Sequence, residues 1–356
     1  MRERNRTEIS TLGEFGLIKH LTQNIKLVNS STIRGVGDDC AVLKYDDSRR
    51  VLVTADLLTE GIHFDLTYVP LKHLGYKAVM VNLSDIYAMN GTPRQIVVSV
   101  ALSKKFCVED MEDLYAGMRL ACEAHGVDLV GGDTNSSLTG LVISITCIGE
   151  AEEGKITYRS GAKDTDLICV SGDLGAAYMG LQLLEREKAV YFQQEAERKQ
   201  KKQEDMQATP DFSGKEYLLE RQLKPEARRD IVQRLAKANI LPTSMIDISD
   251  GLSSELLHIC SQSKAGCRIY EERLPIDYQT AVMAEELNMN VTTCALNGGE
   301  DYELLFTVPL ALHEDVCKIE DVKVIGHITR PELGNILITR DGQEFTLKAQ
   351  GWNPLA

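Results

Sequence analysis

The chain has 356 residues, 43% hydrophobic and 26% charged, which is the composition of a folded protein and a length that favours two compact domains. Its net charge of −14 disfavours a general binder of nucleic acids or anionic membranes. The charged N-terminus, the short apolar runs and nine scattered cysteines without C-x-x-C spacing predict a cytoplasmic protein with neither a membrane span nor a disulfide framework.

Apolar runs of strand length alternate with helical patterns along the chain, which predicts a mixed α/β or α+β fold. A helix is expected over 109–125, where a broad apolar stripe repeats, and another is expected to begin at Pro225 and end before Pro242. Periodicity does not decide the order of the strands. Strands are expected at 51–55, 96–102, 141–148, 167–171, 245–248, 304–308 and 335–339.

A domain boundary is expected near 149–154, where a strong strand gives way to an acidic turn, so we predict domains at 1–150 and 151–356. Within the second domain the stretch 185–221 stands apart, because it holds nine acidic and eight basic residues. Its part 195–206 is almost entirely charged or amide side chains and has no apolar stripe, which indicates an exposed helix or a mobile insertion. No function follows from this stretch.

The motifs of P-loop and protein kinases, serine hydrolases and H-E-x-x-H zinc enzymes do not occur in the sequence. Instead, acidic residues recur beside glycines and at the ends of apolar runs. Mg²⁺ takes oxygen ligands and bridges carboxylates to phosphate oxygens, while glycine lets backbone N–H groups approach those phosphates. The pattern therefore favours a Mg²⁺–phosphate site. The acidic motifs lie at 35–39, 53–56, 82–85, 131–134, 247–251 and 298–301.

Each acidic motif also has a purely structural explanation. Asp250 precedes an apolar helical series and fits a helix N-cap, Asp85 equally fits a helix that begins near Lys72, and 298–299 fits a simple turn. The combination favours a site over these separate explanations, because carboxylates gathered at strand ends repel one another unless cations bind them.

A colinear series of motifs between residues 13 and 352 resembles the thiamine-monophosphate kinase family. Its aspartate and glycine elements recur in the wider superfamily of aminoimidazole-ribonucleotide synthetases. The motifs are G-E-F-x-L-I at 13–18, G-x-G-D-D-C-A at 35–41, T-x-D at 54–56, G-x-H-F at 61–64, Y-K-A-x-x-V-N-L-S-D at 76–85, G-G-D-T at 131–134, R-S-G-A at 159–162, D-x-S-D-G-L at 247–252, G-G-E-D-Y-E-L at 298–304 and G-W at 351–352.

The resemblance implies a two-domain aminoimidazole-ribonucleotide-synthetase-like fold, whose N-terminal domain forms a β-barrel with that of a second copy in a homodimer. It also implies direct, Mg²⁺-assisted transfer of the γ-phosphate of ATP to thiamine monophosphate, which needs no protein nucleophile. By the same resemblance, several Mg²⁺ ions are held by Asp39, Thr54, Asp56, Asp85, Asp133, Asp247 and Asp250, ATP is contacted by Gly132, Asp133, Arg159 and Ser249, and the thiamine substrate by His63, Glu300 and Trp352.

Several alternatives stay open at this stage. His63 also fits a buried, hydrogen-bonded histidine, and Trp352 a residue that pins the tail to the core. The chain is alternatively another enzyme of the superfamily, of the aminoimidazole-ribonucleotide or selenophosphate synthetase type, although residues 1–34 hold no cysteine of the kind that selenophosphate synthesis uses. A non-catalytic nucleotide or metal sensor would use the same carboxylates, so only ATP-dependent product formation separates it from an enzyme.

Overall fold

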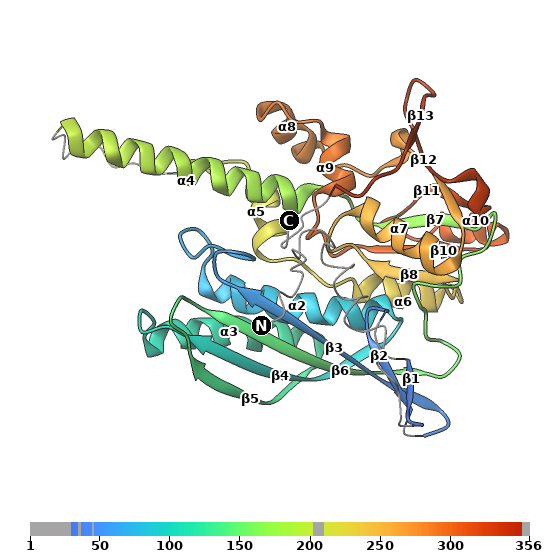
Figure 1. The fold of residues 1–356 in the computed structure, drawn as a ribbon, viewed down its shortest axis with the longest axis horizontal. Coiled ribbons are helices and arrows are strands. Elements are labelled where there is room, and N and C mark those ends of the chain that lie inside the picture. The colour runs from blue at the N-terminus through green and yellow to red at the C-terminus, as the bar shows by residue number, and fades with distance from the viewer. Residues whose placement is uncertain (1–29, 35–36, 45, 202–209, 351–356) are drawn as a thin grey trace, which may run out of the picture.

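Two β-sheets, each with its own helices, make up the protein in a computed structural model that describes residues 30–34, 37–44, 46–201 and 210–350 (Figure 1). The first sheet uses strands β1–β6 and the second β7–β13. This confirms the mixed α/β, two-domain fold at the level of its architecture. The predicted motif at 13–18 and Trp352 lie outside the described residues.

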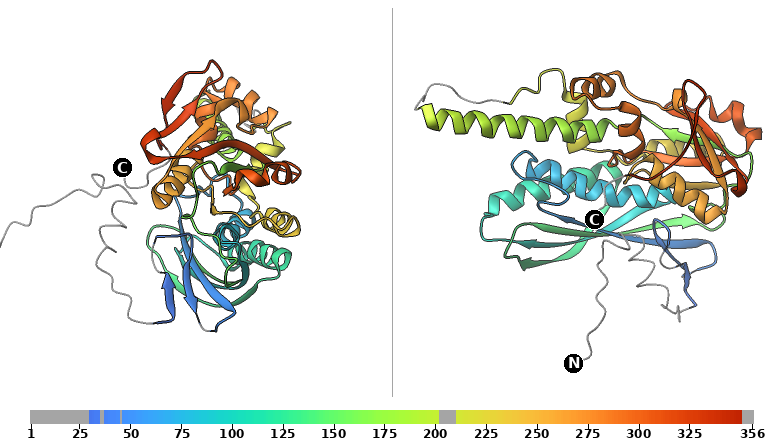
Figure 2. Two further views of the ribbon diagram at one scale, coloured as in Figure 1. Left: turned by 90° about the vertical axis from the view of Figure 1, so that its right-hand side faces the viewer. Right: turned by 45° about the horizontal axis from the view of Figure 1, so that its top comes forward.

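The first sheet has the strand order β1-β2-β3-β6-β4-β5 and is antiparallel except for the parallel pair β4–β5. Helices α2 and α3 cover one of its faces (Figures 1 and 2). On β3, side chains on the helix side are buried in alternation with more exposed ones, as expected for a strand with one covered face. The elements are β1 (Thr32–Arg34), β2 (Ala41–Lys44), β3 (Arg49–Thr59), α2 (Leu71–Ala88), β4 (Thr92–Leu102), α3 (Val108–His125), β5 (Asp128–Ser136) and β6 (Val142–Glu152).

Helix α2 lies at the centre of the molecule, between the first sheet and the second half of the chain (Figure 1). Most of its residues are buried, and Lys77, Asn82 and Ser84 are among them, because packed elements surround the helix. Against α3 it packs backbone to backbone. A Cβ added to Gly75 would lie 1.9 Å from the carbonyl oxygen of Leu114, and one added to Gly117 would lie 1.9 Å from that of Lys72. The two glycines therefore set the close approach that fixes α2 in place.

The second sheet has the order β13-β12-β9-β11-β7-β10-β8 and is antiparallel except for the pair β9–β12. Its buried strands β7 and β10 lie between helices on both faces, and their sequences are correspondingly apolar throughout. The elements are β7 (Leu167–Ser171), α4 (Ala176–Lys201), α5 (Glu216–Leu223), α6 (Arg229–Lys237), β8 (Ser244–Asp247), α7 (Leu252–Ser263), β9 (Gly266–Tyr270), α8 (Tyr278–Glu286), α9 (Val291–Asn297), β10 (Leu304–Val308), α10 (His313–Val316), β11 (Val322–Thr329), β12 (Asn335–Ile338) and β13 (Glu344–Thr346).

The prediction that the stretch 185–221 stands apart from the second domain is only partly correct. The outer part of α4 does run away from the body as an exposed helix (Figure 1). Nearer its start, however, Lys188 lies 2.6 Å from Asp65, and Tyr68 donates a 2.7 Å hydrogen bond to Glu185. The last part of the stretch is α5, which packs into the second half of the molecule with Leu218 fully buried. Single-segment charge patterns carry no signal for such tertiary packing.

Two further predictions need correction. The helix expected at Pro225 is wrong at its start, since α6 begins at Arg229; before it, Glu226 accepts a 2.7 Å hydrogen bond from Tyr76 and Arg228 is held by acidic partners. Strand β5 was not predicted, because its glycines, aspartates and asparagine have low β propensity. It forms by parallel pairing with β4. No helix in the described residues has the length and apolar character that a bilayer span requires.

Candidate active site

Three aspartates from different elements meet where the two halves of the chain face each other. Asp39 lies just before β2, Asp85 near the end of α2 and Asp247 at the end of β8. One carboxylate oxygen of each lies within 4.8 Å of those of the other two. Asp39 and Asp247 are buried, and Asp85 is partly exposed. We call these three residues, together with Asp56 described next, the aspartate cluster.

Hydroxyl and amide groups fix the cluster. Thr54 donates a 2.5 Å hydrogen bond to Asp85, and Ser84 donates one of 2.5 Å to Asp247. The backbone N–H of Asp56 donates to the side chain of Asn82 at 3.2 Å. Thr54 and Asp56 lie two residues apart on β3 and so share a face of that strand. The carboxylate oxygen Oδ2 of Asp56 is buried and has no hydrogen-bond partner among the described residues.

Burial and mutual repulsion disfavour the ionised form of these carboxyl groups. Burial, followed by the charge of Asp39, raises the pKa of Asp247 to about 8. Burial raises the pKa of Asp56 to about 6. For Asp85 the pKa is raised well above its ordinary value by burial and then by the charges of Asp56, Asp247 and Asp39. The cluster thus concentrates negative charge that the protein itself compensates only in part.

The compensation comes from Arg159. Its guanidinium makes two 3.0 Å hydrogen bonds to the two carboxylate oxygens of Asp39. Such a fork also matches phosphate oxygens. Arg159 was predicted as an ATP contact; the structure places it against Asp39 of the cluster, and its contact with ATP stays a prediction.

The donor set suits Mg²⁺. At a metal–oxygen distance of about 2.1 Å, ligands on one octahedral Mg²⁺ lie roughly 3 to 4 Å apart. The three cluster oxygens need only a small contraction to reach that spacing. The unpaired oxygen of Asp56 adds a fourth buried acceptor with no donor from the described residues. A cation would satisfy that acceptor and relieve the repulsion that raises the pKa values.

A second group forms around Glu300. Its carboxylate receives the ammonium group of Lys77 at 3.0 Å and the side-chain amide of Gln222 at 2.9 Å. The backbone N–H of Glu300 donates a 2.7 Å hydrogen bond to the carbonyl of Ser249, two residues after Asp247. The carboxylate predicted to contact substrate therefore lies beside the predicted metal ligands.

The remaining predicted residues lie in different settings. Ser249 and Asp250 follow β8 directly, and the backbone N–H of Asp250 donates to Glu255 at 3.0 Å. Asp250 is not the N-cap of α7, because that position is Gly251. The ring nitrogen Nδ1 of His63 accepts a 3.0 Å hydrogen bond from the backbone N–H of Thr59.

Gly132 and Asp133 lie on β5, the exposed edge strand, and not beside the aspartate cluster. Through the registers of β5, β4, β6 and β3, Asp133 is aligned with Leu57, three strand spacings away. That separation is about 14 Å. Within one chain, the structure thus brings together Asp39, Thr54, Asp56, Asp85 and Asp247, and it leaves Asp133 at the opposite edge of the sheet.

Comparisons with known proteins identify the family. Residues 37–151 match the model of the AIR synthase related protein, N-terminal domain. Thiamine-monophosphate kinase of Bacillus subtilis (strain 168) is 32% identical over 355 residues, which cover 96% of this chain and 99% of that protein. The chain belongs to the thiamine-monophosphate kinase family. Its relative from Aquifex aeolicus (strain VF5) is 34% identical over 301 residues, covering 85% of this chain and 87% of that protein.

A solved structure agrees with this membership over the whole fold. The structure of AaThiL complexed with AMPPCP and TMP is 31% identical, covers 98% of this chain and 99% of that chain, and superposes with a TM-score of 0.80. The resemblance seen in the sequence motifs is thereby confirmed at the level of the family.

Sequence reasoning assigned no role to Lys77, Gln222, Ser84 or Asn82. Lys77 carries one local signal: it stands directly before the apolar run Ala78–Val81 of α2, and a buried lysine needs a partner. Ser84 and Asn82 belong to the motif that carries Asp85, and helical spacing alone places Asn82 and Asp85 near one face. Gln222 has no signal in its own segment, because its contact with Glu300 spans 78 residues.

Proposed function

We propose that this protein phosphorylates thiamine monophosphate with ATP to give thiamine diphosphate and ADP, the last step of thiamine diphosphate synthesis. The observation that carries the proposal is the aspartate cluster, in which Asp39, Asp85 and Asp247 each offer an oxygen within 4.8 Å of the others, in a chain of this family. The complex of the similar AaThiL with AMPPCP and TMP supports both substrates. In the transfer, the bond from the γ-phosphorus to the ADP oxygen breaks, and a bond to an oxygen of the acceptor phosphate forms.

Asp39, Asp56, Asp85 and Asp247 would hold Mg²⁺ ions, with Thr54 and Ser84 fixing two of the carboxylates by hydrogen bonds. When bound, these ions would neutralise the charge of the reacting phosphates and align them, which is the main requirement of phosphoryl transfer. We propose Asp250 as a further ligand. Arg159 and Ser249 would contact ATP from the side of the second half of the chain.

At the acceptor end, we propose that Glu300 faces the cationic thiazolium ring of the substrate. A carboxylate attracts such a ring, and the hydrogen bond from Glu300 to Ser249, two residues after Asp247, supports the proposal. His63 and Trp352 are proposed as further contacts with the thiamine moiety. For His63 the support is its place in the loop that contacts the middle of α4 through Asp65 and Tyr68.

We further propose a cytoplasmic homodimer in which the first sheets of two copies close into one barrel. The support is that β5 is an exposed edge strand, with Val130 59% and Leu129 38% exposed. The sheet face away from α2 and α3 also carries Leu57, which is 55% exposed. Gly132 and Asp133, proposed as nucleotide contacts, would then lie at the junction of two copies. The nine cysteines are all free thiols, which supports a reducing compartment.

The decisive experiment is a product assay with purified protein, ATP and thiamine monophosphate, with and without Mg²⁺, and with unphosphorylated thiamine as the control acceptor. The proposal expects thiamine diphosphate only from the monophosphate and only with Mg²⁺. Binding of ATP without any phosphorylated product would overturn it and would favour a sibling enzyme of the superfamily or a nucleotide sensor.

A further inference from the structure

The segment that carries Glu300 has a strained backbone. Glu300 and Tyr302 have φ angles of 60° and 51°, and the preceding Gly299 has a φ angle of 70°. For residues other than glycine this left-handed region costs free energy, and it persists only where the surroundings fix it. The question is therefore which contacts hold Glu300 in this conformation.

Part of the answer lies in hydrogen bonds to the segment after β8. The backbone N–H of Glu300 donates to the carbonyl of Ser249 at 2.7 Å, and that of Tyr302 donates to Ile248 at 2.9 Å. In return, the N–H of Ile248 donates to the carbonyl of Glu303 at 2.8 Å. The loop of Glu300 and the segment that carries Asp247 are thus one hydrogen-bonded unit.

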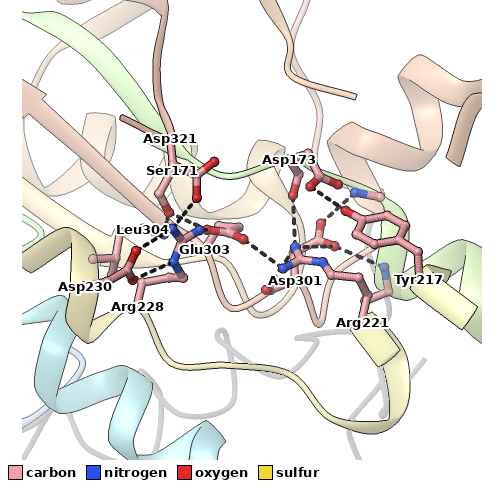
Figure 3. A network of polar contacts seen from close by, with 12 residues as sticks. Ser171, Asp173, Tyr217, Arg221, Arg228, Asp230, Asp301, Glu303, Leu304 and Asp321 are labelled. Carbon is pink, nitrogen blue, oxygen red and sulfur yellow. Dashed lines mark hydrogen bonds and ion pairs between the residues drawn. The ribbon is translucent and has the colours of Figure 1, made fainter. Parts of the chain in front are cut away.

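The rest of the answer lies in a buried set of ion pairs around Glu303, which Figure 3 shows. Glu303 is fully buried and is held by Arg221 at 2.9 Å, by Arg228 and by the hydroxyl of Ser171 at 2.5 Å. Arg228 also contacts Asp230 at 3.0 Å and Asp321 at 2.5 Å. We call this set, with Arg221 and its partners, the arginine network.

Arg221 extends the network to the other side of the loop. One of its amino groups donates to the carbonyl of Asp173 at 3.0 Å and lies 3.8 Å from the carboxylate of Asp301. Asp301 in turn accepts hydrogen bonds from the backbone N–H groups of Gly175 at 2.8 Å and Ala177 at 3.3 Å, at the start of α4. Arg221 therefore contacts the residues on both sides of Tyr302, Asp301 and Glu303.

The neighbour of Arg221 on α5 holds Glu300 itself. Gln222 is 5% exposed and donates to one carboxylate oxygen of Glu300, while Lys77 contacts the other. Lys77 also donates to the backbone carbonyl of Gln222 at 3.2 Å. A carboxylate only accepts hydrogen bonds, so the amide nitrogen of Gln222 must face Glu300. Both oxygens of Glu300 are thereby fixed in direction.

We propose that the last turn of α5 is part of the substrate site: Gln222 orients the Glu300 carboxylate directly, and Arg221 is a positioning residue that holds its loop through Glu303. The inference rests on the proposed function, in which Glu300 faces the thiazolium ring. The inference gives Arg221 and Gln222, which belong to no recognised motif, a role in recognising the cationic acceptor. Neither residue is required to contact ATP.

The test is steady-state kinetics of the full-length protein with both substrates varied. Gln222→Leu keeps the volume of the side chain and removes its hydrogen bond. We expect the KM for thiamine monophosphate to rise about ten-fold, while kcat and the KM for ATP change less than about two-fold, since a ground-state contact is lost. The matched control is Gln193→Leu, which removes an exposed 3.2 Å hydrogen bond to Glu197 on α4 and should leave all constants unchanged.

Arg221→Met and Arg221→Lys test the positioning role. Methionine should raise the same KM, and lysine, which keeps the charge but not the fork, should restore part of the loss. Arg268→Met, which breaks a pair with Glu344 in the same half, is the control. A lower melting temperature with an unchanged KM for thiamine monophosphate in Arg221→Met, or an unchanged KM in Gln222→Leu, would overturn the inference. If Arg221→Met does not fold, Gln222→Leu carries the test.

A wild-type protein that forms no thiamine diphosphate would reject the proposed function, and the inference with it. Wild-type turnover together with unaltered variant kinetics would reject the inference alone.

Discussion

The aspartate cluster and the arginine network are two groups of buried carboxylates in neighbouring parts of one molecule, and they differ in how their charge is compensated. In the network, Glu303 has two arginines and a serine hydroxyl as partners. In the cluster, the side-chain hydrogen bonds that Asp85 and Asp247 accept from the described residues come from the hydroxyls of Thr54 and Ser84. Within the protein Glu303 is therefore paired on both carboxylate oxygens, whereas the cluster carries an excess of negative charge that a cation would neutralise. Buried acids therefore indicate a site only where their partners are too few.

The largest expected effect is on activity, and it comes from the cluster. Asp85→Asn should lower kcat/KM about 1,000-fold, because a lost metal ligand removes several kcal/mol of charge stabilisation in the transition state. The fold should be kept, since the change relieves repulsion and the asparagine carbonyl can still accept from Thr54. Product formation and circular dichroism measure the two effects. Asp315→Asn, on an exposed helix, is the matched control, and equal activity of the two variants would contradict the metal assignment.

The next effect is on stability, and it should come from the network. Glu303→Gln leaves Arg221 and Arg228 buried without their shared counter-ion, so the free energy of unfolding should fall by about 3 to 5 kcal/mol. Urea denaturation measures it. Glu344→Gln, which breaks an exposed pair with Arg268, should cost less than about 1 kcal/mol. A loss in Asp85→Asn as large as that in Glu303→Gln would erase the distinction between the two groups.

A third effect concerns pH. Folding raises the pKa of Asp247 from its ordinary value of 3.8 to about 8. Between about pH 4 and pH 8, Asp247 is therefore protonated in the folded protein and ionised in the unfolded chain. The free energy of unfolding of the metal-free protein should therefore lose this contribution as the pH rises from about 4 to about 8. Asp247→Asn removes the titrating group. The variant should gain stability relative to wild type as the pH rises, and a difference that is independent of pH would contradict the burial of an uncompensated carboxyl group.

The smallest effect belongs to a contact that is in neither group. Lys188 pairs with Asp65 between α4 and the loop of His63, and both side chains are more than a quarter exposed. Lys188→Met should change the free energy of unfolding by less than about 1 kcal/mol, because solvent screens the pair. If the free energy of unfolding falls as much as in Glu303→Gln in the same urea assay, the exposed pair contributes more to the position of α4 than solvent screening allows.

The sequence predicts most of this arrangement and fails where long-range pairing decides. The local pattern placed Asp39, Asp56, Asp85 and Asp247 in acidic motifs beside apolar runs, and the family resemblance predicted them as metal ligands. That Asp133 lies elsewhere depends on the strand order, because β5 pairs outside β4 rather than beside β3. Periodicity carries no information about that order.

The support around Glu300 was even less accessible to sequence reasoning. Arg221 and Gln222 lie at the end of a stretch whose mixed charges indicate solvent exposure. Their partners Glu303 and Glu300 are 82 and 78 residues away. Only the packing of α5 against the loop turns these two side chains inward, and a single-segment pattern cannot show such a contact.

The most direct test of the account is calorimetric titration of Mg²⁺ into the protein with a saturating non-hydrolysable ATP analogue, near pH 7 in two buffers of different ionisation enthalpy. We expect Mg²⁺ binding to be accompanied by proton release, because the metal displaces the proton that Asp247 holds below a pKa of about 8. Binding should weaken at least ten-fold in Asp85→Asn and stay unchanged in Glu344→Gln. Two results would contradict the assignment of the aspartate cluster as a metal site. One is that the protein binds no Mg²⁺ beyond the ion bound to the nucleotide; the other is that Asp85→Asn binds Mg²⁺ as tightly as the wild type.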